Sequence, residues 1–593
     1  MVSIKHHQKD LISYNITSHT MTEALLSILS ENVDPSAALF LNGELIAIGE
    51  EERFSRAKHA YNEFPIQAIK YCLDEGAVTF RDVDLITYGW DANKYPLYMA
   101  KKYLDGWQNY DKDQRTLEWE KSNLESKNPD SMTEKIKQEL LSEFGGPIPP
   151  IKFLNHHRAH AAAAYYGSGF ESAAVLTTDG HGEENAVVGW KADNTGLTEV
   201  FTYEIPHSLG WFYASITAFL GFKPNNGEGK VMGLAPYGEE TESIRSALTQ
   251  VLEVNDEGFS IDPSFIFYGE HNYHERFTDQ LVEVLGEPRQ RDAEITQFHR
   301  NIAHTAQNLL QEALETCAES LLEQTGETKL CLAGGVGYNC KANMHLRESL
   351  DLDDFFVHPL SGEAGIPLGA GHLFTDLEVS PRPLQHVYYG WEPSEDQVKK
   401  AINSHNIEIC EEGEESVRKK MVTLLSEGNI IARYSGRMEC GPRALGNRSI
   451  LADPRNTEMV ARVNEATKRE NWRPFAPSIL KEYADNMLKG EIWDPFMIQT
   501  YQVKEEWLDK LAATTHVDNT TRPQILSKQM NEPYWLLIEN FREQTGVPAL
   551  LNTSFNLSGE PIVRTPEEAI MTLIDSEIDY LQIEDYLIQN PTV

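Results

Sequence analysis

Short apolar runs alternate with longer amphipathic stretches along most of the chain, and their spacing predicts strands that lead into helices. Residues 37–40 and 45–48 are strand-like and flank Asn42-Gly43, a dipeptide typical of two-residue turns, so they predict a β-hairpin. Residues 173–178 and 329–333 have the length and apolar character of buried strands. Strands that stop at Gly or Asp before a helix indicate an α/β domain, which binds ligands at the carboxyl ends of its strands.

Helical patterns fill much of the remaining chain. Residues 101–144 are rich in Lys, Glu and Gln at helical spacing and predict a solvated helical insertion, and residues 295–324 predict a further helix. Residues 381–383 have the character of a linker, and Ser394 is suited to cap a helix over 394–403. We therefore place a domain boundary near residue 384, between domains 22–384 and 385–593, and the sequence shows no internal repeat.

Charge and composition narrow the possible partners. The chain carries 91 Asp and Glu against 52 Lys and Arg, a formal net charge of -39, which repels nucleic acid and anionic membranes. No stretch approaches the roughly 20 apolar residues of a membrane helix, and residues 1–20 lack the apolar core of a signal peptide, so we expect a cytoplasmic protein. Met21 could be the natural start, with residues 1–20 an upstream extension. The six cysteines lack CxxC spacing, which indicates neither a disulfide framework nor a zinc knuckle.

Three residues in the first domain form a candidate metal site. His156 and His160 are four apart in an alanine-rich helical segment, so their imidazoles share one face and could ligate one ion. Asp179 ends an apolar run in a Gly-flanked turn, where its carboxylate could complete the site or reach a nucleotide phosphate. The alternative is that the histidines are ordinary polar residues at a helix start and that Asp179 caps its own turn.

Three Gly-rich turns are candidates for nucleotide contacts. Gly334-Gly335, followed by Asn339, lies between a predicted strand and a helix, where backbone N–H groups could approach a phosphate or an adenosine. Glu363 lies in a similar loop, and Lys230 precedes the flexible position Gly233. Each could equally be a tight connection or a surface residue.

The window from Arg433 to Arg473 predicts an anion site. It holds eight arginines and one lysine against five acidic residues, although the whole chain is strongly acidic. Arg443 and Arg473 lie beside Gly or Pro instead of at helical spacing, which favours a ligand site over a solvated face. No Ser-His-Asp triad or Cys nucleophile is evident, so the chemistry indicated is activation of an anion and not covalent catalysis.

Several long strings, in order from about residue 27 to residue 585, resemble the O-carbamoyltransferase family that includes nodulation-factor, cephamycin and tobramycin carbamoyltransferases. They are EEERFSR at 50–56, NHHxxH at 155–160, KVMGLAPYG at 230–238, GGVxxNC at 334–340, GRMExGPRALGNRS at 436–449, RPFAP at 473–477 and NTSFN at 552–556.

The resemblance implies an α/β and α+β protein with two domains. The first would be similar to actin-like (ASKHA) ATPases and the second to YrdC-type domains. It also implies two steps. ATP and carbamoyl phosphate would give carbamoyl-adenylate and pyrophosphate in the second domain, and the hydroxyl of a small-molecule acceptor would then attack the carbamoyl group in the first, releasing AMP. The acceptor could be an antibiotic, a toxin, a sugar or a nodulation factor, and a homodimer is implied as possible.

The resemblance also implies roles for individual residues. Asp34, Arg443 and Arg473 would be catalytic, and a divalent metal, iron by the resemblance, would be held in the first domain while Mg²⁺ accompanies ATP. Carbamoyl phosphate would be bound by Arg443, Lys468, Arg473, Arg522 and Ser554. The nucleotide would be bound by Lys230, Gly233, Gly334, Gly335 and Asn339. The metal would be held by His156, His160, Asp179 and Glu363.

The chain departs from the family pattern at three positions. Val33 stands where the family has a His before Asp34, a candidate general base for the acceptor hydroxyl. Glu363 stands for an aspartate metal ligand, and Thr467 for a lysine whose place Lys468 could take. The Val33 departure leaves open an amine-carbamoylating relative or a non-catalytic nucleotide-binding protein. The acidic charge argues against a tRNA-modifying one.

Overall fold

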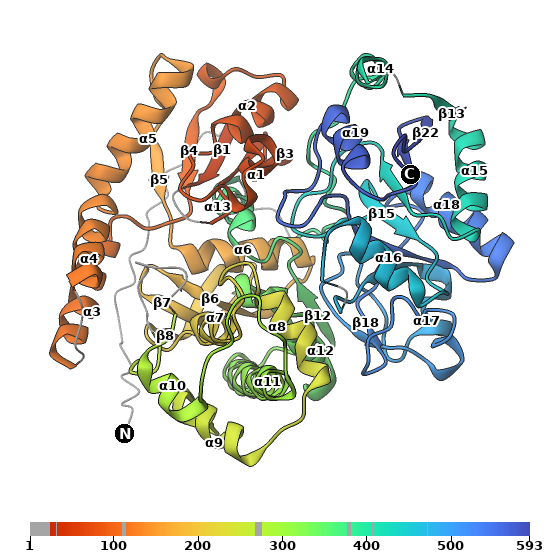
Figure 1. The fold of residues 1–593 in the computed structure, drawn as a ribbon. Coiled ribbons are helices and arrows are strands. Elements are labelled where there is room, and N and C mark those ends of the chain that lie inside the picture. The colour runs from red at the N-terminus through yellow and green to blue at the C-terminus, as the bar shows by residue number, and fades with distance from the viewer. Residues whose placement is uncertain are drawn as a thin grey trace.

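The computed structural model describes residues 24–593 apart from 31–32, 110–113, 267–275, 376–380, 406 and 471. The chain forms two parts that lie side by side, residues up to about 384 in one and the rest in the other (Figure 1). The alternative start at Met21 lies outside the described residues. In the described part of the chain, no helix combines the length and apolar character that a bilayer crossing needs.

The first sheet contains five strands in the order β3-β2-β1-β4-β5. Asn42 and Gly43 join β2 to β3 with φ of 49° and 83°, the left-handed backbone that a two-residue hairpin turn requires, so the predicted hairpin is confirmed. The strands are β1 Ala24–Leu29, β2 Ser36–Leu41, β3 Glu44–Glu50, β4 Leu85–Tyr88 and β5 Ile151–Phe153.

The second sheet repeats the first. Its order is β12-β11-β6-β7-β8. In each sheet, the three strands that come first along the chain (β1–β3 and β6–β8) form an antiparallel meander. The two later strands (β4 and β5, β11 and β12) add in parallel beside the first strand of that meander. The two runs predicted as buried strands are confirmed as β6 and β11. The strands are β6 Ala173–Gly182, β7 Asn185–Asp193, β8 Gly196–Glu204, β11 Lys329–Ala333 and β12 Asp354–Val357. This duplication is structural, because the sequence shows no repeat.

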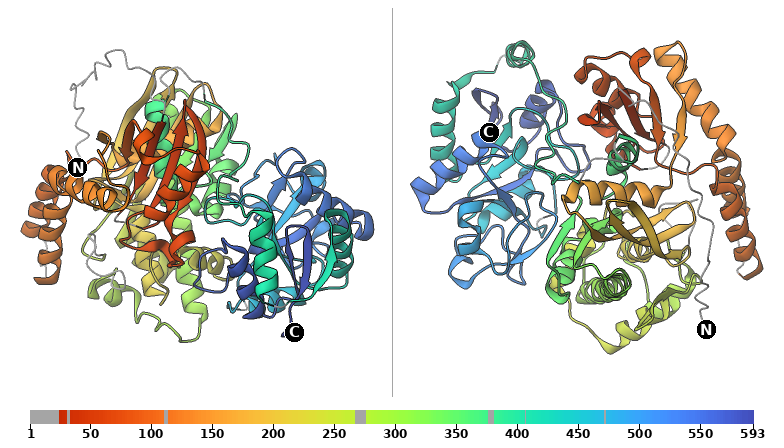
Figure 2. Two further views of the ribbon diagram at one scale, coloured as in Figure 1. Left: turned by 90° about the horizontal axis from the view of Figure 1, so that it is seen from above. Right: turned by 180° about the vertical axis from the view of Figure 1, so that it is seen from behind.

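Two helices fill the space between these sheets. Helix α6 (His156–Ser168) packs on β6 and β11, and α13 (Ile366–Thr375) packs on β1 and β2. They approach closely, because a Cβ at Gly369 would lie 1.8 Å from the Ala159 carbonyl oxygen. Helix α2 (Ile66–Glu75) covers the far face of the first sheet, and α11 (Gln297–Thr325) the far face of the second. The duplicated sheets with helices between and outside them have the actin-like arrangement that the resemblance implied (Figure 2).

Three helices form an extension along the outer edge of this part (Figure 1). The predicted helical segment 101–144 is occupied by α3 Tyr95–Asn109, α4 Gln114–Ser126 and α5 Pro129–Phe144. Helix α5 begins after Asn128, whose side chain accepts a hydrogen bond from Ser131 N at 2.9 Å. The remaining α-helices and strands of the described residues before residue 384 are α1 Glu51–Ser55, α7 Leu209–Phe219, α8 Glu228–Leu234, α9 Glu242–Val251, β9 Leu252–Asn255, β10 Gly258–Ile261, α10 Asp279–Leu285 and α12 Cys340–Ser349.

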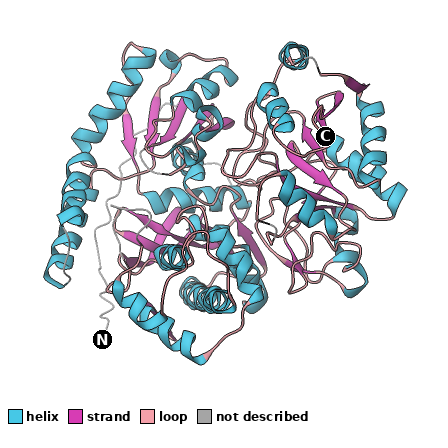
Figure 3. Cartoon of the chain, viewed as in Figure 1, coloured by secondary structure: helices cyan, strands magenta, loops and turns pink. Residues whose placement is uncertain are grey.

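The C-terminal part is built on an eight-stranded mixed sheet in the order β13-β22-β21-β14-β15-β20-β16-β19. Its strands are β13 Ile409–Glu412, β14 Ile431–Tyr434, β15 Arg448–Ala452, β16 Ala476–Leu480, β19 Gln524–Leu526, β20 Ala549–Ser554, β21 Tyr580–Ile583 and β22 Tyr586–Gln589. Its helices are α14 Glu395–Ser404, α15 Glu414–Ser426, α16 Glu458–Ala466, α17 Lys481–Met487, α18 Glu532–Thr545 and α19 Pro566–Ile574 (Figure 3). Ser394 caps α14, as predicted, by accepting from Gln397 N.

The two parts are joined by apolar packing and by arginines. Phe40 and Ile48 of the first sheet pack in one buried cluster with Leu445 and Phe496 of the C-terminal part. Arg53 crosses the junction and donates to the Gly441 carbonyl at 2.8 Å. The predicted boundary at residue 384 lies in an extended segment, 381–394, that lacks helices and strands. The α/β and α+β fold class predicted from the sequence is confirmed by these sheets.

Candidate active site

One cavity of about 450 Å³ lies where the two parts meet. Asp34, Asp179 and Glu363 of the N-terminal part line it, together with Arg443 and Arg473 of the C-terminal part. Predicted catalytic, metal and anion-binding residues therefore share one space. The cavity lies at the carboxyl ends of β6 and β11, where the α/β topology places ligands.

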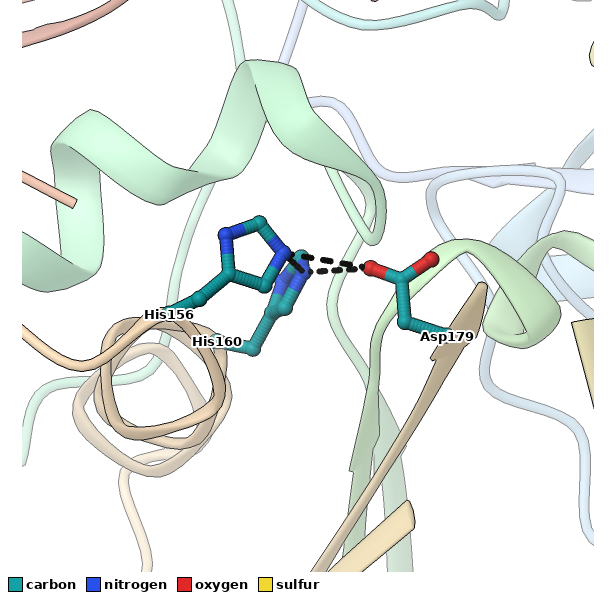
Figure 4. A group of neighbouring side chains, drawn as sticks. All are labelled: His156, His160 and Asp179. Carbon is teal, nitrogen blue, oxygen red and sulfur yellow. Dashed lines mark hydrogen bonds and ion pairs between the residues drawn. The ribbon is translucent and has the colours of Figure 1, made fainter. Parts of the chain in front are cut away.

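His156, His160 and Asp179 form a tight cluster (Figure 4). Asp179 Oδ2 lies 2.9 Å from His160 Nε2 and 3.4 Å from His156 Nε2, and the two Nε2 atoms are 3.1 Å apart. Both rings lie on one face of helix α6, because His156 and His160 are about one helical turn apart. Asn155 caps the N-terminus of this helix. Three potential ligand atoms thus point at one position.

The donors of this cluster are suited to a divalent ion. His156 Nδ1 lies 3.2 Å from the Gly89 carbonyl, which can only accept, so Nδ1 carries the proton and Nε2 keeps its lone pair. Burial alone would raise the pKa of the Asp179 carboxyl, but its contacts with the His156 and His160 side chains outweigh burial and hold the pKa well below its usual range. Burial also lowers the pKa of His160, which favours the neutral ring that a metal requires.

Glu363 lies near this cluster without belonging to it. Among the described residues, the group of mutually close ligand atoms around Asp179 consists of His156, His160 and Asp179, and Glu363 is not part of it. Burial, followed by the charges of Asp179 and Asp34, raises the pKa of the Glu363 carboxyl well above its usual range. Glu363 therefore lies within electrostatic reach of both aspartates, and its role as a ligand stays a prediction.

Some of the residues predicted to bind the nucleotide line the cavity, and others lie outside its lining. Lys230, Gly335 and Asn339 line the cavity, whereas Gly233 and Gly334 are not among its lining residues. Gly334 has φ of 94°, and a Cβ there would lie 2.1 Å from the Thr178 carbonyl oxygen, so its packing against β6 already requires glycine.

Two of these side chains have protein partners. Lys230 Nζ lies 2.5 Å from Glu470 Oε1 of the C-terminal part. The Asn339 amide exchanges hydrogen bonds with Gln307 and accepts from Ala342 N, which caps α12. A nucleotide phosphate would therefore compete with Glu470 for Lys230. In the 335–339 turn, Gly337 N and Asn339 N already donate to the Gly334 and Val336 carbonyls.

Three arginines of the C-terminal part form a cation cluster. Burial, followed by the charge of Arg522, lowers the pKa of Arg443 to about 9. Burial also lowers the pKa of Arg473, and Arg522 adds to this effect. Within the described residues, the buried Nε atoms of Arg443 and Arg522 have no hydrogen-bond partner. Buried cations that repel one another and keep unused donors are suited to bind an anion.

The other predicted carbamoyl phosphate residues are differently placed. Ser554, at the end of β20, accepts a hydrogen bond from Arg469 Nη2 at 2.9 Å. Lys468 is exposed, with φ of 57°, and does not line the cavity. Arg469 instead also donates to Thr553 and Asn556, and burial lowers its pKa to about 10. Sequence reasoning missed Arg469, because nothing in the string indicates which of two adjacent cations points inward.

Sequence reasoning also missed residues after β3. Glu52, Lys58 and His59 line the cavity beside Asp34. The string at 50–56, one of the markers of the family resemblance, leads directly into this turn. The fold and the cavity thus define a two-part α/β protein that can hold anions beside a cluster suited to a metal.

Comparisons with known proteins identify the class. Residues 29–372 match the family described as Carbamoyltransferase N-terminus, and residues 422–590 match Carbamoyltransferase C-terminus. Nodulation protein NolNO of Sinorhizobium fredii is 36% identical over 581 residues, which cover 94% of this chain and 79% of that protein. An uncharacterized protein of Synechocystis is 32% identical over 608 residues, covering 95% of this chain and 96% of that protein. The chain belongs to the carbamoyltransferase family and is a carbamoyltransferase enzyme, as the resemblance implied.

Solved structures show more remote likeness. A HypF structure in the phosphate- and nucleotide-bound form is 13% identical, covers 61% of this chain and 57% of its own, and has a TM-score of 0.32. The ROK hexokinase of Thermus thermophilus is 15% identical, covers 59% of this chain and 97% of its own, and has a TM-score of 0.28.

Proposed function

We propose that this carbamoyltransferase uses ATP and carbamoyl phosphate to form carbamoyl-adenylate, and then transfers the carbamoyl group to a hydroxyl of a small-molecule acceptor. The observation that supports this most is that one cavity is lined both by Arg443 and Arg473 of the arginine cluster and by Asp179 of the candidate metal cluster. An intermediate formed at the arginines can reach the second site without entering bulk solvent.

The arginine cluster supplies what the first step needs. Carbamoyl phosphate and ATP are both anions and must approach each other closely. Arg443, Arg473 and Arg522 offer positive charge and forked donors at the position where negative charge accumulates. Arg469 and Ser554 extend this surface along the end of β20. The mixed anhydride with AMP then gives the carbamoyl group a better leaving group.

His156, His160 and Asp179 would hold a divalent metal in the N-terminal part, with Glu363 close to it. When bound, an Fe²⁺ ion would anchor and polarise the phosphate of the adenylate. Other residues of the chain would position the nucleotide and shield the intermediate. The backbone of the 335–339 turn and Lys230 would bind the nucleotide, Mg²⁺ would accompany ATP, and the buried walls of the cavity would limit loss of the intermediate to water.

Mass spectrometry of the purified protein incubated with ATP, Mg²⁺ and carbamoyl phosphate tests the first step. We expect carbamoyl-adenylate and pyrophosphate to appear only when carbamoyl phosphate is present, with acetyl phosphate as a control of similar charge. If neither product forms in protein shown to bind ATP and metal, the proposal is wrong, and a non-catalytic nucleotide-binding role would be favoured.

A further inference from the structure

An imidazole and a carboxylate from two different turns meet at the wall of the cavity. Asp34 lies between β1 and β2, and His59 lies in the short turn after α1. His59 Nδ1 is 2.9 Å from Asp34 Oδ1, and both side chains line the cavity. A carboxylate can only accept, so Nδ1 donates its proton, and the lone pair of the neutral ring is left on Nε2.

His59 Nε2 is buried and has no hydrogen-bond partner among the described residues. The side chain as a whole is only 13% exposed. A buried acceptor without a donor is costly, and its usual explanation in a native protein is a function or a group that binds there. An acceptor hydroxyl in the cavity would supply the missing donor.

The side chain and the backbone of His59 together make three hydrogen bonds that hold the residue in place. Besides the Nδ1 contact, His59 N donates to Glu52 Oε2 at 2.8 Å, and Asp34 N donates to the His59 carbonyl at 3.0 Å. Asp34 and His59 have φ of 54° and 66°, a left-handed backbone that is unfavourable for both residues. Strain of this kind persists where the surrounding contacts fix it, and it is concentrated at functional sites.

The charges around His59 are mostly compensated. Burial would raise the pKa of Glu52, but Arg53 at 2.9 Å and Lys58 at 3.0 Å outweigh it and lower the pKa to about 2. Because Glu52 is already paired with two cations, the group of Asp34, Glu52 and His59 is poorly suited to bind a metal ion. The charge of Glu228 also acts on His59, and the ring of Tyr61 lies beside the His59 ring. Val33, next to Asp34, cannot titrate.

We propose that His59 is the general base of carbamoyl transfer and that Asp34 positions it. The inference rests on the proposed function. As the acceptor oxygen attacks the carbamoyl carbon, Nε2 takes the hydroxyl proton. The new C–O bond forms, the bond from that carbon to the AMP phosphate oxygen breaks, and AMP leaves with the electron pair. The imidazolium then releases its proton to solvent, while Asp34 stabilises its charge.

The variant His59→Gly suits the test, because φ of 66° is readily adopted by glycine and the lost ring leaves room for imidazole. Glycerol serves as the hydroxyl probe. Hydroxylamine serves as a nucleophile that needs no deprotonation before attack. With ATP, Mg²⁺ and carbamoyl phosphate, we expect unchanged pyrophosphate formation and hydroxyurea formation within about threefold of the wild type, since neither requires a base. Carbamoylation of glycerol should fall by roughly 10²–10⁴-fold, and added imidazole should restore part of it.

Two further variants sharpen the test. His345 lies 2.8 Å from Glu315 and forms a similar histidine–carboxylate pair that does not line the cavity, so His345→Ala should leave all three rates unchanged. Asp34→Asn should lower transfer to glycerol without imidazole rescue, because the His59 ring still fills its place.

The outcomes separate the two proposals. Glycerol carbamoylation at the wild-type rate in His59→Gly would overturn the role of His59 while leaving the proposed function intact. Equal loss of the glycerol and hydroxylamine reactions, without imidazole rescue, would also overturn it, because His59 would then bind the adenylate. Absence of carbamoyl-adenylate in the wild type would overturn the proposed function and this inference with it.

Discussion

Arg522 lies close enough to Arg443 and Arg473 for its positive charge to lower the pKa of both guanidinium groups. Burial and the charge of Arg522 lower the pKa of Arg443 to about 9 and also lower the pKa of Arg473, but both side chains remain cations at neutral pH. Such an arrangement is unfavourable in the empty protein and is relieved when an anion binds. At the residue scale, the C-terminal site therefore combines repulsion among its arginines with attraction for an anion.

Arg443→Ala should reduce carbamoyl-adenylate formation by at least about 100-fold, since a preorganised donor at developing charge contributes roughly 10²–10³ in rate. Pyrophosphate release measures this. Arg462→Ala is the matched control, because Arg462 lies in the same basic window but is 46% exposed and bonds to the Gly428 carbonyl. Normal adenylate formation in Arg443→Ala would refute the placement of the first step.

His156→Ala should remove one bound divalent ion per chain, because it deletes one of three clustered ligands. Metal analysis of the purified variant measures the ion directly. We expect carbamoyl-adenylate formation to persist while transfer stops. His157→Gln is the control, since both His157 ring nitrogens already bond to Thr177 and the Asn185 carbonyl. Equal metal content in His156→Ala and the wild type would remove the metal site from the mechanism.

At the scale of elements, the 494–500 loop joins the C-terminal part to α12. The buried carboxylate of Asp494 accepts hydrogen bonds from Phe496 N, Ile498 N and Gln499 N at 2.9, 2.7 and 2.6 Å. The loop it organises accepts from Asn343 at the Ile498 carbonyl and from Arg347 at Gln499. One side chain thus shapes a loop that fixes the helix after the nucleotide turn.

Asp494→Asn should change how stability depends on pH. Burial raises the pKa of Asp494 to about 6 from 3.8, so its stabilising contribution is fully present below about pH 4 and is lost as pH rises through about 6. The variant lacks this loss. Its deficit in free energy of unfolding relative to the wild type should therefore narrow by up to about 3 kcal/mol between pH 4 and pH 7. Urea unfolding at several pH values measures it, and a constant deficit would contradict the assignment.

Local signals in the sequence identified elements whose structure depends on a few neighbouring residues. Asn42-Gly43 defines the first hairpin, Ser394 caps α14, and the His156 to His160 spacing puts both rings on one helix face. These features follow from backbone conformation and helical period, which a short string specifies.

Features that depend on tertiary placement could not be predicted in this way. His59 and Asp34 meet across 25 residues through two left-handed turns, which only the folded chain brings together. The sequence pattern predicts Lys468 as a carbamoyl phosphate ligand, although Arg469 is the cation that bonds to Ser554. The repeated sheet order also leaves no repeat in the sequence, because buried strands require only apolar residues and not particular ones.

At the scale of the whole molecule, arginines from both parts secure the junction. Arg53 is buried and pairs with Glu52 at 2.9 Å while donating to the Gly441 carbonyl. Arg56 donates to the Pro561 and Ile562 carbonyls, and Arg564 donates back to the Arg53 carbonyl. These contacts hold the two walls of the cavity together, so unfolding of the two parts should be coupled.

Arg53→Ala should lower the free energy of unfolding by about 3–5 kcal/mol, because it leaves the buried Glu50 carboxylate without its cation and Glu52 with Lys58 alone. We expect one calorimetric transition in the wild type and separate transitions for the two parts in the variant. Arg382→Ala is the control. Its ion pair with Glu44 is 67% exposed on each side, so its loss should cost at most about 1 kcal/mol. A single transition at the wild-type temperature in Arg53→Ala would contradict this view of the junction.

The repeated strand order has a consequence for how the enzyme can diversify. The first hairpin of one sheet carries Asp34, and the first hairpin of the other carries Asp179, so equivalent turns of a duplicated unit face one cavity. Each turn belongs to a separate sheet with its own hydrogen-bond ladder. Exchanging residues 33–35 for those of a relative would therefore alter the groups that meet the acceptor while leaving the cluster of His156, His160 and Asp179 untouched. Duplication makes the two halves of the site independently interchangeable.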